Sequence, residues 1–210
     1  LESYRDVPSV CWLLQEFDKK EEMYTFLNYI LDMDKLKRWK AAFNLVEDND
    51  ASHSFRATAL SAFNGYVEMF KYGKEINMFA LLGKTLFHDL VEVKTGDAKG
   101  DIKHLNHKIK EAFKMYEKKM AETMIEHLPC FLKEEISNFM IDAKDDTYEG
   151  MLVDISDKLD ALIKTNMEMK ICPSEYENLY YKLLERIQHT YGDVPCVLFF
   201  LAFPLHDIIR

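Results

Sequence analysis

Residues 77–97 read NMFALLGKTLFHDLVEVKTGD, and their apolar positions recur at the three- and four-residue spacing of a buried helix. The helix is expected to end at the turn-forming residues 95–97. Just before that end, Glu92 follows His88 by four positions and Asp89 by three. A continuous helix would therefore place these three side chains near one another at its end. Imidazole and carboxylate together suit a divalent transition metal. Two ligands alone would bind such an ion poorly, so this segment predicts a metal site only if other segments add donors.

The rest of the chain also favours helices. Its 210 residues include only 7 Gly and 5 Pro, which indicates few tight turns and long regular elements. No segment keeps the strict polar and apolar alternation of a strand. We therefore expect an all-α fold in a single domain, with helices over 9–33 (broken near 18–20 and continued through 34–46), 53–70, 77–93, 101–128, 132–143, 149–170, 174–192 and 197–205.

Charge and composition argue against several classes of partner. A net charge of −9 disfavours nucleic acid, which needs a basic face, but leaves room for a small phosphorylated ligand. The most apolar run, residues 197–205, is too short to span a bilayer and contains Pro204, so no membrane partner is expected. The four cysteines are far apart, which is typical of reduced thiols, and the start LESYRD carries no targeting signal. We expect a cytoplasmic protein.

Two other segments offer further metal donors. His53 opens a predicted helix directly after a polar loop, where a core histidine is unexpected, and Ser52 is the expected N-cap of that helix. Asp157 lies among apolar neighbours in VDISDKLDALI, so its carboxylate needs a partner. Asp154 and Asp160 flank Asp157 at a distance of three residues on each side and are competing candidates.

Three stretches share the pattern of a known family. RWKAAFNLVEDNDASHS (38–54) has an Arg-Trp pair ahead of a first metal-binding His, and HDLVEVKTGD (88–97) matches a His-Asp-x-x-Glu-x-x-Thr-Gly-Asp segment. DISDKLDAL (154–162) matches an Ala-Asp-x-Leu segment, with Ser156 in place of Ala. The chain resembles the HD-domain metal-dependent phosphohydrolases, and most closely the YfbR-like 5′-deoxynucleotidases.

This resemblance implies an architecture and a cofactor. It implies one HD domain, a helical bundle, over residues 1–210, with an N-terminal helical extension at 1–36, a metal-site core at 38–165 and C-terminal helices at 174–210. Homologous enzymes are dimers, so a homodimer is expected. One divalent transition metal of the Mn, Co or Zn class is expected, with Mg possible. The implied metal ligands are His53, His88, Asp89 and Asp157.

The resemblance also implies roles for residues around the metal. Glu92 would orient or deprotonate the attacking water, and Arg38 would hold the phosphate. Trp39 would pack against the sugar, and Asp97 would help to place the nucleoside. One departure stands out, because the family usually has a Glu immediately before the first His where this chain has Ser52. That change affects fine positioning rather than metal binding.

Each motif has a structural alternative when it is taken alone. A second His-Asp pair at 206–207 lacks the Glu and the Thr-Gly-Asp that follow the first pair, and we interpret it as structural. The joint occurrence of the three stretches in the right order favours a metal site at His88 and Asp89 over a hydrogen-bonded core pair. The open alternatives are a surface cation for Arg38, a core filler for Trp39, a turn residue for Asp97 and a solvated helix residue for Glu92.

The expected function is metal-dependent removal of phosphate from nucleoside 5′-monophosphates, most of all deoxyribonucleotides, by in-line attack of a metal-bound water. One rival is a dNTP triphosphohydrolase, which would need more cations near the mouth, and Lys94, Lys99 and Lys103 could supply them. Another rival is a catalytically silent nucleotide-binding module. The presence of Glu92 and Arg38 argues against such a module.

Overall fold

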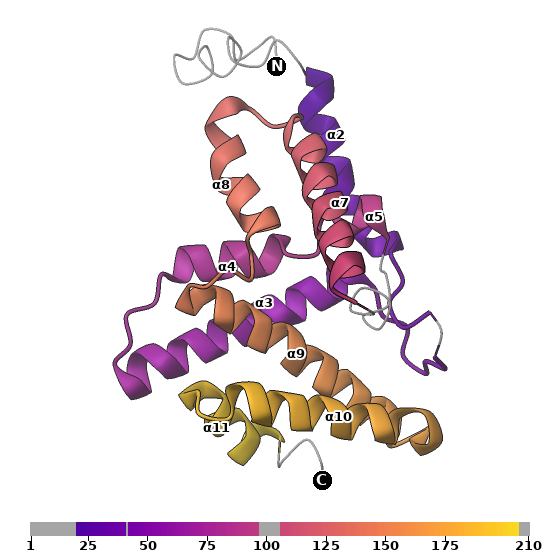
Figure 1. Ribbon diagram of the computed structural model, residues 1–210, viewed down its shortest axis with the longest axis vertical. Coiled ribbons are helices and arrows are strands. Elements are labelled where there is room, and N and C mark those ends of the chain that lie inside the picture. Colours follow the sequence, from indigo (N-terminus) through magenta and orange to yellow (C-terminus); the bar gives the residue numbers. More distant parts are fainter. Residues whose placement is uncertain (1–19, 41, 97–105, 206–210) are drawn as a thin grey trace, which may run out of the picture.

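The computed structural model describes residues 20–40, 42–96 and 106–205, and in these ranges the protein is built from helices (Figure 1). The one extended pairing within them is an isolated bridge between Lys37 and Asn49. The all-α expectation is confirmed. The α-helices are α2 (Lys20–Asp32), α3 (Asp50–Tyr66), α4 (Met78–Phe87), α5 (Glu92–Thr95), α7 (His107–Ile125), α8 (Cys130–Ile141), α9 (Tyr148–Met169), α10 (Pro173–Tyr191) and α11 (Pro195–Ala202), with a 3₁₀ segment η2 (Met33–Lys35) and a π-helical segment η3 (Val67–Lys71).

Helix α9 is the central element, and it packs against α3, α4 and α10 (Figure 1). Its apolar residues recur at three- and four-residue spacing, and Leu152, Ile155, Leu159 and Leu162 are fully buried. Thr147 caps the helix by accepting a hydrogen bond from the Gly150 amide at 3.0 Å. The long buried stripe fixes the rotation of α9, and with it the side on which its carboxylates lie.

The core consists of two apolar clusters. The first joins α9 to α4, α10 and α11 through residues such as Leu81, Ile187 and Phe200. The second cluster joins α2, α7, α8 and the turn after α4. Leu90 of that turn and Met124 of α7 are both fully buried in it. The turn at residues 88–91 therefore links α4, which contributes to the first cluster, to the second cluster.

The structure corrects three local predictions. The helix expected over 77–93 is interrupted after Phe87, because residues 88–91 form turns with three-residue hydrogen bonds such as Glu92 N to Asp89 O at 2.9 Å. Residues 36–40 and 42–49 form a loop instead of continuing the first helix. The N-cap of α3 is Asn49 and not Ser52, since the Asn49 side chain accepts from the Ser52 amide at 2.8 Å.

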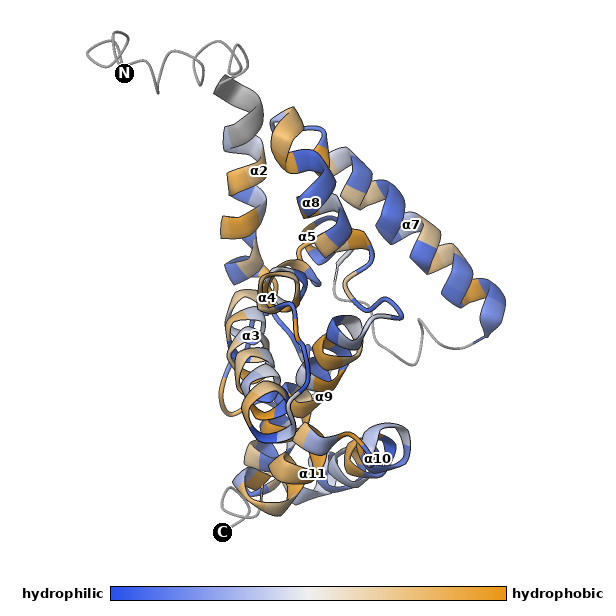
Figure 2. Ribbon diagram, turned by 90° about the vertical axis from the view of Figure 1, so that its left-hand side faces the viewer, coloured by the Kyte–Doolittle hydropathy of each residue, from blue (hydrophilic) through white to orange (hydrophobic). Residues whose placement is uncertain are grey.

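The surface character differs between helices. Helix α7 is mostly hydrophilic along its length, whereas α11 is hydrophobic (Figure 2). Among the described residues, no helix combines the length and apolarity that crossing a membrane requires. The predicted division into residues 1–36, 38–165 and 174–210 stays a prediction. Helix α2, which lies in the first of these parts, contributes Phe26 and Tyr29 to the second cluster.

Candidate metal centre and active site

His53 lies in the first turn of α3, and its side chain is fully buried. Its Nδ1 donates a hydrogen bond to Asp160 Oδ2 at 2.7 Å. Its Nε2 lies 3.3 Å from Asp157 Oδ1 and 3.4 Å from Asp89 Oδ2. The hydrogen bond at Nδ1 fixes the ring so that Nε2 faces two carboxylates from different elements.

His88 follows the last residue of α4 and is also buried. Its Nδ1 donates to the Thr85 carbonyl at 2.7 Å, and its Nε2 lies 3.2 Å from Asp89 Oδ2. The imidazole rings of His53 and His88 lie 5.4 Å apart between centroids. Both Nε2 atoms therefore converge on one carboxylate oxygen, and a His ring held through Nδ1 is the usual arrangement of a metal-ligating histidine.

The donor set fits a divalent cation. Neither His53 Nε2 nor His88 Nε2 has a hydrogen-bond partner, although both atoms are buried. Burial lowers the pKa of His53, but the carboxylates of Asp157, Asp160 and Asp89 outweigh it and hold that pKa well above its usual value. The site therefore favours positive charge between its imidazoles and carboxylates. Ligand atoms of His53, His88 and Asp89 lie within 4.8 Å of one another, so the structure brings three of the four predicted ligands into one potential metal site.

Asp157, the fourth predicted ligand, comes from α9 and contacts His53 Nε2, but it lies outside the group whose ligand atoms are within 4.8 Å of one another. Burial raises the pKa of Asp157, but Lys144 and the two histidines keep it well below its usual range. Asp89 behaves in the same way, since His88 and His53 outweigh the effect of its burial. Both carboxylates are therefore anionic, as metal ligands must be.

Arg38 reaches the same centre from the loop before α3. Its Nη1 lies 3.1 Å from Asp89 Oδ2 and 3.2 Å from Asp50 Oδ1. The ligand atoms of Asp50, Asp89 and Glu92 also lie within 4.8 Å of one another, and Arg38 brings a positive charge to this acidic group. A guanidinium placed beside a ligand carboxylate can bind a phosphate with two parallel hydrogen bonds.

The loop that carries Arg38 is held at both ends and in its middle. The Arg38 amide donates to Asp48 O at 3.0 Å, and the Asp50 amide donates to Leu36 O at 3.1 Å. Glu168 on α9 accepts from the amides of residues 45 and 46 at 3.0 and 3.2 Å. These contacts fix the entry of Arg38 into the site, although the loop has no regular secondary structure.

Trp39 has a positive φ of 58°, a conformation that is uncommon for a residue with a large side chain. Its ring lies 6.3 Å from the ring of Tyr176 on α10, and with Arg38 it lines a hollow of about 250 Å³. It does not line the cavity of His88 and Asp89. Its contact with the sugar stays a prediction, and the predicted residue Asp97 lies outside the described residues.

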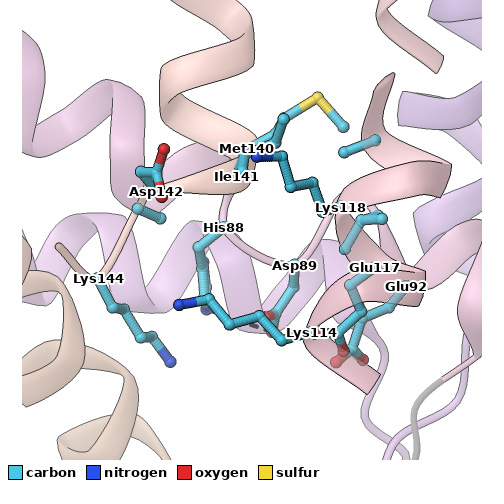
Figure 3. Close-up of a pocket in the computed structure, with 13 residues that line it drawn as sticks. His88, Asp89, Glu92, Lys114, Glu117, Lys118, Met140, Ile141, Asp142 and Lys144 are labelled. Atoms are coloured by element: carbon cyan, nitrogen blue, oxygen red, sulfur yellow. Dashed lines mark ion pairs between the residues drawn. The ribbon is translucent and has the colours of Figure 1, made fainter. Parts of the chain in front are cut away.

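A cavity of about 360 Å³ opens beside the predicted ligands (Figure 3). Glu92, the first residue of α5, is buried and lines this cavity, and its action on a water stays a prediction. The titratable residues that line the cavity are His88, Asp89, Glu92, Lys114, Glu117, Lys118, Asp142 and Lys144.

Comparison with known proteins identifies the family of this chain. The family model described as 5′-deoxynucleotidase YfbR-like matches residues 25–208. The chain belongs to this family. The matched range includes all the motifs that carried the resemblance, so the resemblance is confirmed. The expected enzyme class, a phosphohydrolase acting on nucleoside monophosphates, is confirmed with it.

Individual relatives of the YfbR-like chain agree with the family assignment. A 5′-deoxynucleotidase of Photorhabdus laumondii is 26% identical over 164 residues, which cover 78% of this chain and 83% of that protein. The 4′-phosphooxetanocin A phosphatase of Priestia megaterium is 23% identical over 190 residues, which cover 88% and 96%. A crystal structure of an HD-domain phosphohydrolase from Listeria innocua is similar with a TM-score of 0.81 and 28% identity over 89% of each chain.

The structure of this YfbR-like protein separates the three aspartates that the sequence left in competition. Asp157 faces His53 Nε2, whereas Asp160 holds the opposite nitrogen of the same ring and pairs with Arg56 at 2.6 Å. Asp154 contacts Lys144, Lys158 and Tyr191. Asp160 therefore supports a predicted ligand, and the 107 residues between it and His53 hid this contact from the sequence analysis.

Several cations near the site were missed or misplaced by the sequence analysis. Lys114, Lys118 and Lys144 line the cavity, and none was predicted to do so. Lys94, suggested for a triphosphate site, instead places its ammonium 4.6 Å from the ring centroid of Tyr29. Lys99 and Lys103 lie outside the described residues. Lys144 could not have been found from spacing, because it precedes α9 in a connection whose path the sequence does not define.

Proposed function

We propose that this chain cleaves deoxyribonucleoside 5′-monophosphates to nucleoside and inorganic phosphate at the centre formed by His53, His88, Asp89 and Asp157. The observation that supports this most directly is the pair of buried Nε2 atoms of His53 and His88, which face carboxylate oxygens and lack hydrogen-bond partners. A family of 5′-deoxynucleotidases supplies the substrate class.

The four residues would hold one divalent metal of the Mn, Co or Zn class, with Mg as a possible alternative. Two imidazoles and two carboxylates suit several of these ions, and availability often decides between them. Such an ion supplies two things when bound, a lowered pKa for a coordinated water and neutralisation of charge that develops on phosphorus. Asp160 and the Thr85 carbonyl orient the two imidazoles for this purpose.

The other predicted residues act on the substrate and on the water. Glu92 accepts the proton of the attacking water, and its buried position in the cavity wall supports this role. Arg38 binds the phosphate, supported by its contact with the ligand Asp89. Trp39 packs against the sugar and Asp97 helps to place the nucleoside, both by analogy with the family.

The rival activities are less well supported. A dNTP triphosphohydrolase would use Lys94, which lies against Tyr29 in this structure. A catalytically silent nucleotide-binding module would not need Glu92 at the cavity or Arg38 at Asp89. Lys114, Lys118 and Lys144 line the cavity, and these three cations would suit a monophosphate as well as a triphosphate. They therefore do not favour one activity over the other.

We also propose a homodimer in the cytoplasm. Helix α3 and η3 leave large apolar side chains exposed on one side, among them Phe55, Phe63, Tyr66 and Phe70, and a second copy could cover them. The described cysteines Cys130, Cys172 and Cys196 are free thiols, as is usual in a reducing compartment. Light scattering coupled to size exclusion tests the dimer, and a monomer at micromolar concentration contradicts it.

A phosphate-release panel tests the activity. Nucleoside mono- and triphosphates, ribo and deoxy, are assayed with added Mn²⁺ or Co²⁺, and the wild type is compared with Asp89→Ala. Metal-dependent phosphate release from deoxyribonucleoside monophosphates, absent in the variant, is the expected result. Release of tripolyphosphate from triphosphates would instead identify the triphosphohydrolase. Metal binding without any release would indicate the silent module.

A further inference from the structure

Lys144 is the cavity residue with the most direct contact to a proposed metal ligand. It lies in DAKDD (142–146), the connection between α8 and α9, and it lines the cavity together with His88 and Asp89 (Figure 3). Its Nζ contacts Asp157 Oδ2 and lies 3.7 Å from Asp154 Oδ1. The sequence gave this lysine no role, and the proposed function has not used it.

The two oxygens of Asp157 face different groups. Oδ1 lies 3.3 Å from His53 Nε2, in the proposed metal centre, whereas Oδ2 accepts from Lys144. The ammonium therefore borders the metal centre without covering the oxygen that faces the imidazole. A metal held through Oδ1 would leave the contact between Lys144 and Oδ2 in place.

Each of the two carboxylates proposed as metal ligands is paired with one side-chain cation, either Arg38 or Lys144. Arg38 Nη1 contacts Asp89 at 3.1 Å, and Lys144 Nζ contacts Asp157. A divalent metal would balance the charge of these two carboxylates. The two side-chain cations would then be available to a phosphate monoester, which carries nearly two negative charges at neutral pH.

The connection that carries Lys144 is anchored on the side that leads into α9. Lys84 of α4 contacts Asp145 Oδ2 at 2.6 Å and Thr147 Oγ1 at 3.2 Å. The Thr147 amide donates to Asp145 Oδ1 at 3.2 Å, and the Thr147 hydroxyl caps α9. The backbone of Lys144 is thus fixed, while 36% of its side chain is exposed and can follow a ligand in the cavity.

We propose that Lys144 is a substrate-binding residue that contacts an oxygen of the substrate phosphate while Asp157 ligates the metal. This inference rests on the proposed function for the identity of the substrate, but it requires only a metal and a phosphate group. Asp157 and Asp154 hold the ammonium at the edge of the proposed metal centre. Such positioning limits the side-chain freedom that must be lost when phosphate binds.

The test uses Lys144→Gln and Lys144→Met in the full chain. Gln retains a donor for Asp157 but no charge, and Met retains only the length of the side chain. Lys158→Gln and Lys158→Met are matched controls, because Lys158 pairs with Asp154 on the same helix but does not line the cavity. Calorimetry first measures the affinity of each protein for Mn²⁺ in phosphate-free buffer, and then the affinity of the Mn²⁺-loaded protein for inorganic phosphate.

The Lys144 variants are expected to keep the affinity for Mn²⁺ within about threefold and to weaken phosphate binding about tenfold or more, as for loss of a charge-assisted hydrogen bond. The KM for a deoxyribonucleoside monophosphate should rise by a similar factor, while the Lys158 variants bind phosphate like the wild type. Wild-type phosphate binding by both Lys144 variants would overturn the proposal. The proposal would also be overturned if the Lys144 variants lost Mn²⁺ affinity and this loss explained all of the weaker phosphate binding. Lys144 would then only orient Asp157.

The binding assay separates this proposal from the proposed function. If the wild type hydrolyses no nucleotide but its Mn²⁺-dependent phosphate binding still depends on Lys144, the nucleotidase activity is wrong and the phosphate contact stands. If the wild type hydrolyses deoxyribonucleotides and the Lys144 variants bind phosphate normally, the activity stands and the contact is wrong.

Discussion

Arg38 Nη1 lies 3.1 Å from Asp89 Oδ2, the same oxygen that the Nε2 atoms of His88 and His53 face at 3.2 and 3.4 Å. A cation of the chain therefore occupies one side of the oxygen that the proposed metal would bind. The guanidinium and the proposed metal would share this ligand, so Arg38 would be placed to meet a phosphate bound there.

Replacing Arg38 should separate phosphate binding from metal binding. Arg38→Met is expected to raise the KM for a deoxyribonucleoside monophosphate about 10- to 100-fold, because a charge-assisted contact to phosphate is lost. Its Mn²⁺ affinity should be equal to or higher than that of the wild type, since a competing cation is removed from Asp89. Steady-state kinetics and metal titration measure the two quantities. Unchanged KM would show that Arg38 only neutralises Asp50 and Asp89.

Asp160→Asn tests the support of His53. The variant keeps the size of the side chain but loses the charge that accepts from His53 Nδ1 and from Arg56. Loss of such an outer partner typically lowers metal affinity about 10- to 100-fold. Calorimetric titration with Mn²⁺ measures this directly. Lys158→Gln on the same helix is the control, and equal affinities in Asp160→Asn and the wild type would contradict the support role.

Glu92→Gln should affect the chemical step and spare the metal. If Glu92 accepts the proton of the attacking water, kcat is expected to fall about 10²- to 10⁴-fold. Metal affinity should change less than kcat, because Glu92 groups with Asp50 and Asp89 and not with the two histidines. Single-turnover kinetics with saturating Mn²⁺ give the rate, and a metal titration of the same sample gives the control. A variant with wild-type kcat would exclude Glu92 as the base.

Metal should stabilise the native fold through the four ligands. A ligand that binds only the folded state at about 100 times its Kd adds about 2.7 kcal/mol to the free energy of unfolding. The wild type should therefore show a higher Tm with Mn²⁺ than with a chelator, whereas Asp89→Asn and Asp157→Asn should show little difference. Calorimetric scans measure the shift. An equal shift in the Asp157 variant would remove this residue from the ligand set.

The Lys84–Asp145 pair predicts an acid-sensitive contribution to stability. Burial raises the pKa of Asp145, but contacts with Lys84 and Thr147 outweigh this effect and lower it below its usual value. A carboxyl whose pKa is lowered on folding stabilises the protein above its unfolded pKa, and this contribution is lost as the pH falls through the folded pKa. The wild type should thus exceed Asp145→Asn by about 1 kcal/mol at neutral pH, as for a partly exposed pair.

Urea denaturation of both proteins between pH 3 and 7 measures that difference. It should stay constant down to about pH 4, near the ordinary pKa of an aspartate, and shrink at lower pH. Lys84→Met should remove most of the effect of the Asp145 substitution. A difference that persists unchanged at pH 3 would mean that the pair is not its source.

The proposed metal ligands could be selected from the sequence because each lies in a segment whose neighbours carry information. Asp157 lies on a helix with a clear apolar stripe, and His88-Asp89 is followed by a distinctive Glu and Thr-Gly-Asp. The break of the helix at His88 could not be predicted, because apolar spacing continues through residues 90 and 91, which pack into a different cluster from α4. Spacing shows that a residue is buried but not in which cluster it is buried.

The residues that support the site were harder to predict. Asp160 and Lys144 act through contacts with residues distant in the chain or across a turn, and neither belongs to a local pattern. Trp39 shows a further limit, since its positive φ and its contact with Tyr176 depend on a loop held by α9 and α10. Side chains positioned by tertiary contacts require the structure.

The origin of the ligands from three separate segments has a consequence for the unfolded chain. An ion held by His53, by His88 and Asp89, and by Asp157 closes two long loops of the polypeptide. In a polymer description, such closures remove conformational freedom from partly unfolded states more than from the native one. A tightly bound ion would thereby act as a reversible cross-link between these segments. The dissociation rate of the ion would then limit how often α3 and α9 separate.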